Sequence, residues 1–145
     1  MNNIVIYIWT DARGIRKTEC HAAYLIRAVR DGVESDVCVS DYMDVFGTPY
    51  TAEVKALDRA VSRLKARIPD PVVVMSDMAL LREGFYNLVA WKKNNWKNSS
   101  GKNISCADNW KRIEEATSGR IRSAESIGKM DPELETMISI EKEKK

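Results

Sequence analysis

Two short apolar runs constrain the fold of this chain most strongly. Residues 4–9 read Ile-Val-Ile-Tyr-Ile-Trp and residues 72–75 read Val-Val-Val-Met, without alternation of apolar and polar side chains. Strands with one exposed face alternate, whereas strands buried on both faces are continuously apolar. The two runs therefore predict two central strands of an α/β sheet.

An acidic residue stands at the exit of each predicted strand. Asp11 follows the first run, and Asp77 follows the second. In open α/β sheets, ligands bind beyond the carboxyl ends of the strands. The strand–helix–strand order that separates the runs predicts a parallel crossover, which can place the two exits side by side. We expect the two carboxylates to converge there.

A third acidic residue, Glu53, belongs to a predicted helix. The apolar residues from 51 to 68 recur at helical spacing, and Glu53 lies at the edge of their stripe, so we expect it to point towards the sheet. The N-cap is either Thr51 or the pair Thr48-Pro49. Glu53 is accordingly expected in the first turn, where the helix dipole stabilises its negative charge.

Three carboxylates in one cleft favour a metal site. They would repel one another and raise at least one pKa unless cations neutralised them. Hard oxygen ligands favour Mg²⁺ or Mn²⁺ over zinc. The candidate metal ligands and catalytic residues are therefore Asp11, Glu53 and Asp77.

The remaining pattern predicts a single domain over residues 1–145, because no linker or compositional break divides it. The Asp31-Gly32 pair predicts a tight hairpin between two antiparallel strands. The expected elements, in the order βββαβαβα, are strands at 4–10, 20–30 and 33–43, a helix at 51–68, a strand at 72–76, helices at 78–94 and 106–117, a strand at 119–125 and a helix from 132.

Composition narrows the function classes. The chain is 44% hydrophobic and 30% charged, as soluble globular proteins are, and its net charge of +2 gives no strong overall preference for polyanions. No apolar run is long enough to span a membrane and no signal peptide is evident, so we expect a cytoplasmic protein. We also expect a monomer.

The three cysteines lack zinc-site spacing and are interpreted as buried thiols. The lone His21 is interpreted as a packed or surface side chain without chemistry.

The segment from 91 to 112 concentrates the positive charge, with six basic residues against Asp108. Three of the four tryptophans are interleaved with them. The tryptophans can pin two helices together while the lysines keep the segment soluble, or the segment can grip nucleic acid through phosphates and stacked bases. The first interpretation is favoured for the tryptophans and the second for the lysines. The candidate substrate-binding residues are Trp91, Lys92, Lys93, Trp96 and Lys97.

Taken in order, these motifs resemble the ribonuclease H family. The resemblance is carried by Thr10-Asp11, the helix segment Ala52-Glu53-Val54, Met75-Ser76-Asp77 and the tryptophan–lysine pattern of 91–112, which is similar to the family's basic protrusion. It implies a five-stranded mixed sheet flanked by helices. It also implies hydrolysis of the RNA strand of RNA/DNA hybrids with two Mg²⁺ or Mn²⁺ ions, Asp11 bridging both ions and Glu53 and Asp77 holding one site.

The sequence also departs from the family. Ile138 occupies the position of the fourth acidic ligand, for which Glu135 or Asp131 could substitute, although Asp131 is favoured as an N-cap. The family's histidine loop is replaced by Ile127-Gly128-Lys129-Met130, and its asparagine pair by Pro49-Tyr50-Thr51. Two alternatives therefore stay open: a nucleic-acid-binding module with a decayed metal site, and a nuclease of this fold with another substrate.

Overall fold

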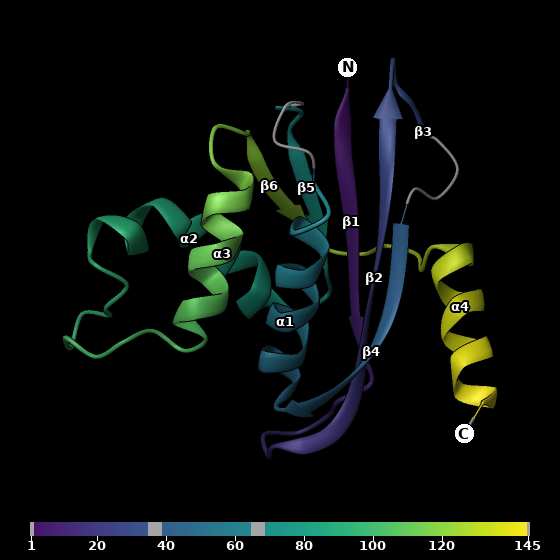
Figure 1. Ribbon diagram of the computed structural model, residues 1–145, viewed down its shortest axis with the longest axis horizontal. Helices are drawn as coiled ribbons and strands as arrows, with labels where there is room; N and C mark the ends of the chain where they lie inside the picture. Colours follow the sequence, from purple (N-terminus) through teal and green to yellow (C-terminus); the bar gives the residue numbers. More distant parts are fainter. Residues whose placement is uncertain (1, 35–38, 65–68, 145) are drawn as a thin grey trace.

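The computed structural model describes residues 2–34, 39–64 and 69–144. A twisted sheet forms the middle layer, with α1, α2 and α3 on one face and α4 on the other (Figure 1). The elements are β1 (Asn3–Thr10), β2 (Thr18–Arg30), β3 (Val33–Glu34), β4 (Val39–Gly47), α1 (Pro49–Val61), β5 (Val72–Met75), α2 (Ala79–Lys93), α3 (Ala107–Thr117), β6 (Arg122–Glu125) and α4 (Pro132–Glu143).

The sheet has the predicted mixed topology. β1 pairs antiparallel with β2 and parallel with β5, and β5 pairs parallel with β6. Both β3 and β4 pair antiparallel with β2, so they take the place of the single third strand expected at 33–43. Residues 35–38 of that expectation lie outside the described residues. The parallel crossover from β1 to β5 is confirmed.

The turn between β2 and β3 confirms the hairpin prediction. Asp31 and Gly32 both have positive φ, at 55° and 81°. Two-residue hairpins of this kind need left-handed backbone at both positions, which aspartate and glycine tolerate better than other residues.

Helix α1 begins at Pro49, two residues before the predicted start at residue 51. Thr48 is the N-cap, its hydroxyl accepts from the Thr51 backbone N–H at 3.2 Å, and Pro49 opens the helix. Glu53 therefore lies beyond the first turn, and the expectation that the helix dipole stabilises its charge was wrong. The helix also ends at Val61, short of the predicted limit; residues 65–68 fall outside the described part of the chain.

The burial of β1 explains its continuous apolar run. Ile4, Ile6 and Ile8 pack in the larger core cluster with α1, α2 and α3. Tyr7 and Trp9, which point to the other face, pack against the cluster formed with α4. β1 is thus buried on both faces, as predicted.

The basic segment is a protrusion that begins in α2 and returns through α3, and its loop extends away from the sheet (Figure 1). At its base, Trp110 is fully buried, donates from Nε1 to the Tyr50 hydroxyl at 2.8 Å and meets Trp91 edge-on at 5.4 Å between ring centroids. Trp96 is half-buried against the same cluster. This packing is what the helix-pinning interpretation of the tryptophans predicts.

A buried ion pair holds α4 on the sheet. Arg27 of β2 donates from Nε and Nη2 to the two carboxylate oxygens of Asp131, at 2.7 and 3.0 Å. Asp131 also accepts from the backbone N–H groups of Glu133 and Leu134, so the N-cap prediction is confirmed. Removing Arg27 would leave the buried Asp131 carboxylate without its cation, which typically costs about 3–5 kcal/mol.

A close contact at the base of the protrusion gives a test of this packing. A Cβ at Gly84 would lie 2.6 Å from Cζ2 of Trp110. Gly84→Ala should therefore destabilise the protein by about 1–3 kcal/mol through overpacking, although alanine is the better helix former by about 1 kcal/mol. Urea unfolding measures the difference.

The matched control is Gly128→Ala, because a Cβ there meets nothing within 4 Å. It should change stability by no more than about 0.5 kcal/mol. Equal stability of the two variants would contradict the described packing of α2 on Trp110.

Candidate active site

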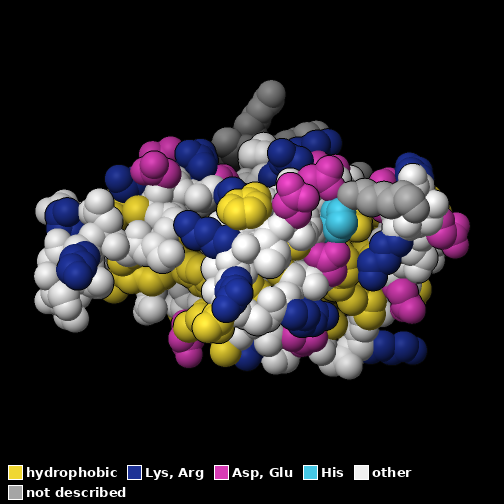
Figure 2. Space-filling view, turned by 90° about the horizontal axis from the view of Figure 1, so that it is seen from below, with side chains coloured by type: hydrophobic (Ala, Val, Ile, Leu, Met, Phe, Trp, Pro, Cys, Tyr) yellow, Lys and Arg dark blue, Asp and Glu magenta, His cyan; other side chains and the backbone are white. Residues whose placement is uncertain are grey.

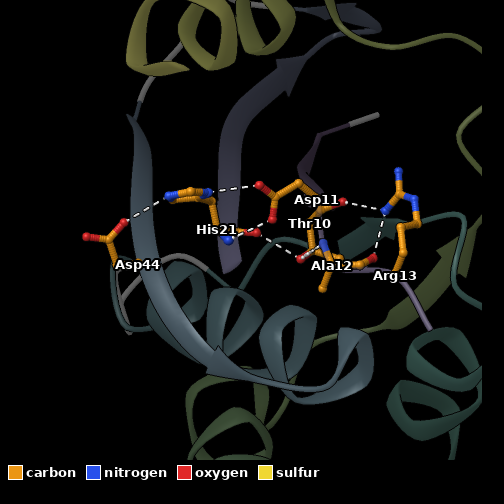
Figure 3. Close-up of polar contacts among 6 residues, drawn as sticks. All are labelled: Thr10, Asp11, Ala12, Arg13, His21 and Asp44. Carbon is orange, nitrogen blue, oxygen red and sulfur yellow. Dashed lines mark hydrogen bonds and ion pairs between the residues drawn. The ribbon is translucent and has the colours of Figure 1, made fainter. Parts of the chain in front are cut away.

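Asp11 follows β1 and is hydrogen-bonded to His21 of β2 (Figure 3). The His21 backbone N–H donates to Oδ1 of Asp11 at 2.7 Å, and Nδ1 of the ring lies 2.8 Å from Oδ2. Asp11 continues the side-chain direction of Trp9, and His21 that of Ala23 and Leu25, so both side chains point to the α4 face. Both oxygens of the carboxylate are thereby engaged.

His21 is also fixed from its other side. Its Nε2 lies 3.2 Å from Oδ1 of Asp44 on β4, and its ring stacks on Tyr42 at 5.2 Å between centroids. In Figure 2 the histidine side chain reaches the surface beside Asp and Glu side chains. The interpretation of His21 as a packed or surface side chain without chemistry did not anticipate this bridge, which depends on the antiparallel register of β1 and β2.

The contacts with His21 set the charge of Asp11. Burial alone would raise the pKa of this carboxyl, but hydrogen bonds from the side chain and backbone of His21, with the positive charges of His21 and Lys142, outweigh it. The pKa of Asp11 is therefore below its ordinary value, and the group is a carboxylate at neutral pH.

Glu53 behaves in the opposite way. Its side chain is buried at the sheet-facing side of α1, and the Ser76 hydroxyl donates to its Oε1 at 2.6 Å. Burial raises the pKa of Glu53 to about 7, and the negative charge of Asp77 adds to this effect. The bond from Ser76 and the positive charges of Arg13 and Arg82 only partly offset it. Glu53 is thus poised to gain or lose a proton near neutral pH.

Glu53 and Asp77 share a pocket of about 310 Å³ beyond the carboxyl ends of β1 and β5. Arg13 and Ile127 also line it, and the Ile127 backbone N–H donates to Oδ1 of Asp77 at 2.9 Å. Asp11 is not among the lining residues. Glu53 and Asp77 therefore line one pocket, whereas Asp11, which we expected to converge with Asp77, is bonded to His21.

This arrangement does not fit a two-ion metal centre. Within the described residues, no group of three or more His, Cys, Asp or Glu side chains is placed to hold a metal ion. Two predicted ligands face one pocket, and the third is bonded to an imidazole. The assignment of Asp11, Glu53 and Asp77 as metal ligands stays a prediction.

Neither candidate for a fourth acid lies at the pocket. Ile138 is buried in the cluster beneath α4. Asp131 is occupied by Arg27, whose hydrogen bond is the main cause of its lowered pKa. Glu135 is exposed on α4, and neither acid lines the pocket.

The candidate substrate-binding lysines lie on the protrusion. Lys92 pairs with Glu114 at 3.0 Å, and Nζ of Lys97 donates to the Asn103 side chain at 2.9 Å. Lys93 is exposed. Figure 2 shows Lys and Arg side chains spread over the end of the molecule that the protrusion forms, on the left of the view. The charge of this surface is thus positive where it projects furthest.

The raised pKa of Glu53 makes stability depend on pH. Between about pH 4.5 and 7 the folded state binds more protons at Glu53 than the unfolded state does, so stability should fall as pH rises through this window. The loss should reach up to about 3 kcal/mol. Glu53→Gln should abolish this slope and be the more stable protein at about pH 8.

Urea unfolding at about pH 5 and about pH 8 measures the slope. The exposed Glu83, replaced by Gln, is the matched control and should keep it. A wild-type protein whose stability is flat across the window, or a Glu53→Gln variant with an unchanged slope, would contradict the buried, protonatable carboxyl.

About half of the chain is similar in sequence to curated ribonucleases H. It is 32% identical over 73 residues to ribonuclease H1 of Rattus norvegicus, covering 50% of this chain and 26% of the relative. It is 34% identical over 61 residues to ribonuclease H of Dichelobacter nodosus, covering 41% of each. The chain therefore spans less than half the length of these relatives. No family model matches.

Solved structures extend the likeness to most of the chain. LC9-RNase H1, described as a type 1 RNase H with the type 2 active-site motif, matches with a TM-score of 0.65 at 17% identity, over 86% of this chain and 62% of that one. LC11-RNase H1, solved in complex with an RNA/DNA hybrid, matches with a TM-score of 0.59 at 17% identity, over 86% and 85%. No helix in the described part of the chain could cross a membrane. The chain therefore has the ribonuclease H-like fold, with ribonuclease H sequence similarity over half of its length.

Proposed function

We propose that this chain hydrolyses the RNA strand of RNA/DNA hybrids, cutting within the strand. The observation that carries the proposal is the pair of carboxylates, Glu53 and Asp77, in one pocket beyond β1 and β5 of a ribonuclease H-like sheet. The sequence similarity to ribonucleases H supports it. So does the fold shared with LC11-RNase H1, which was solved with a hybrid.

The residues around the pocket suit a phosphodiester substrate. Arg13 lines the pocket, and its Nη1 is held by the backbone carbonyls of Thr10 and Ala12, at 3.1 and 2.8 Å. A guanidinium fixed in this way is suited to orient a phosphate beside the two carboxylates. Glu53, with a pKa of about 7, can exchange a proton at neutral pH.

The proposal includes a requirement for Mg²⁺ or Mn²⁺, two ions per site. Its ligands would be Asp11, Glu53 and Asp77, of which only the last two face the pocket. Carboxylate oxygens are the donors that these ions prefer. Asp11 would have to leave His21 to join them.

A second candidate function is a nucleic-acid-binding module with a decayed metal site. Two observations favour it. Ile138 occupies the position of the family's fourth acidic ligand, and the described residues include no group of three side chains placed to hold a metal ion. A nuclease of this fold with another substrate is the third, and a panel of duplexes distinguishes it. In each case the protrusion would carry the contacts to phosphates.

Cleavage is tested with one strand labelled in an RNA/DNA hybrid, alongside single-stranded RNA and duplex DNA, in Mg²⁺ and in Mn²⁺. The RNA strand of the hybrid should be cut, and Asp11→Asn should lower the rate by about 10²-fold or more, since a carboxylate that the proposal brings to the reacting phosphate is lost. Binding without cleavage in either metal would contradict the proposal and favour the decayed-site module. Cleavage of another duplex alone would favour the third function.

The protrusion is tested by the salt dependence of hybrid binding. Lys93→Ala should weaken binding at low salt and reduce the slope of log affinity against log salt concentration by about 1, because one phosphate contact is lost. Arg30→Ala is the matched control, since Arg30 lies at the opposite end of β2 from His21. Titrations without divalent ions avoid cleavage. An unchanged slope for Lys93→Ala would contradict a phosphate-binding protrusion.

A further inference from the structure

The strand β6 is the last of the sheet on the side of α2 (Figure 1), and in the described part of the chain it pairs with β5 alone. The Glu125 carbonyl faces the β5 side, where it accepts from the Ser76 backbone N–H at 3.0 Å. Alternate residues of a strand present their backbone groups to opposite edges, so the N–H and C=O of Ala124 face the open side. An open edge of this kind is a template on which another strand can add.

Tyr86 of α2 occupies this open side. Its hydroxyl accepts from the Ala124 backbone N–H at 2.9 Å and donates to the Ala124 carbonyl at 3.1 Å. In a hydrogen-bonded pair of antiparallel strands, a residue exchanges both of its backbone bonds with the residue opposite. A hydroxyl is both donor and acceptor, so it can make the same two bonds. Tyr86 therefore takes the place of an opposing strand residue.

The strand β6 itself offers little else to keep a second strand away. It contains no proline, and Arg122 is turned towards α3, where its Nε donates to the Thr117 hydroxyl at 2.8 Å. If two copies of the chain paired antiparallel about Ala124, each Glu125 would lie opposite Ser123 of the other copy. No like charges would oppose each other in that register. The sequence of β6 is thus compatible with self-pairing.

Exposed apolar side chains flank the same edge. Val89 follows Tyr86 by three residues on α2, and Ile121 directly precedes β6; their side chains are 53% and 72% exposed. A second copy added to this edge would cover part of this apolar surface, which favours association. Every copy carries the same edge, so a second copy of this chain is the strand donor that fits it.

We propose that the Tyr86 hydroxyl closes the β6 edge and thereby keeps two copies of this chain from joining their sheets. The hydroxyl already makes the bonds that a second strand would offer to Ala124. Pairing would have to displace Tyr86 and would gain no net hydrogen bond there. The inference is independent of the proposed function, because it involves neither the pocket nor the basic residues of the protrusion.

The first test is amide hydrogen exchange in dilute protein, followed by NMR. Tyr86→Phe keeps the ring but removes the hydroxyl, and the Ala124 N–H should exchange about tenfold faster than in the wild type, because one hydrogen bond is lost. The internal control is the Val72 N–H, which donates at 2.9 Å to the Ile121 carbonyl on the β5 side and should be unaffected. Equal exchange at Ala124 in the two proteins would overturn the proposal.

The second test is association, measured by sedimentation velocity over a wide range of protein concentration. Tyr86→Ala removes the ring as well as the hydroxyl, so it should form dimers as the concentration rises. The wild type should stay monomeric over the same range. Dimers of the wild type, or a Tyr86→Ala variant that remains monomeric throughout, would overturn the proposal.

The double variant Tyr86→Ala/Ala124→Pro separates strand pairing from the exposed apolar surface. Proline lacks an N–H, and at this position it disturbs no bond to β5, so the double variant should be monomeric. Association that persists in it would overturn the proposal. If it fails to fold, hydrogen exchange of Tyr86→Ala across the same concentrations decides. The Ala124 N–H should become protected as dimers form, and association without that protection would overturn the proposal equally.

Discussion

The burial of β1 on both faces is the constraint on which the rest of the structure depends. Its residues alternate between the core cluster of α1, α2 and α3 and the cluster beneath α4, so a shift of β1 by one residue would exchange the side chains that fill these two clusters. The same alternation decides where the next residues point. Asp11 continues on the α4 face beside His21, whereas Glu53 reaches the pocket beyond β1 and β5 from α1.

The two acids at this end of the sheet consequently have opposite electrostatic environments. Asp11 receives two hydrogen bonds and has a lowered pKa, whereas Glu53 is buried beside Asp77 and has a pKa of about 7. One carboxyl is a stabilised anion and the other is close to its titration point. Groups whose environments separate their pKa values in this way are typical of functional sites.

Much of the fold could be predicted because it follows from local signals. The continuous apolar runs predicted β1 and β5. Asp31-Gly32 predicted the hairpin, because few other residue pairs tolerate positive φ at both positions. The start of α1 was ambiguous because Thr48 and Thr51 are both good caps. They lie almost one helical turn apart, which was enough to misplace Glu53 relative to the helix dipole.

The site was less predictable because it depends on contacts distant in sequence. Predicting the contact of Asp11 with His21 requires knowledge of the register between β1 and β2, which are joined by a loop without a turn signature. Predicting the contact of His21 with Asp44 also requires the register between β2 and β4. The ion pair of Arg27 with Asp131 joins the second strand to the last helix. The Asp131-Pro132 pair allowed the N-cap role of Asp131 to be predicted, but nothing in the sequence indicated that Arg27 would be its buried partner.

The central claim is that Asp11, Glu53 and Asp77 form one cation-dependent site once Asp11 leaves His21. The most direct measurement is a crystal structure of the protein soaked in Mn²⁺, with the ion located by its anomalous scattering. The account predicts Mn²⁺ in the pocket against Glu53 and Asp77, with the Asp11 carboxylate turned away from His21. A pocket without Mn²⁺, with Asp11 still bonded to His21 at saturating ion concentration, would contradict it.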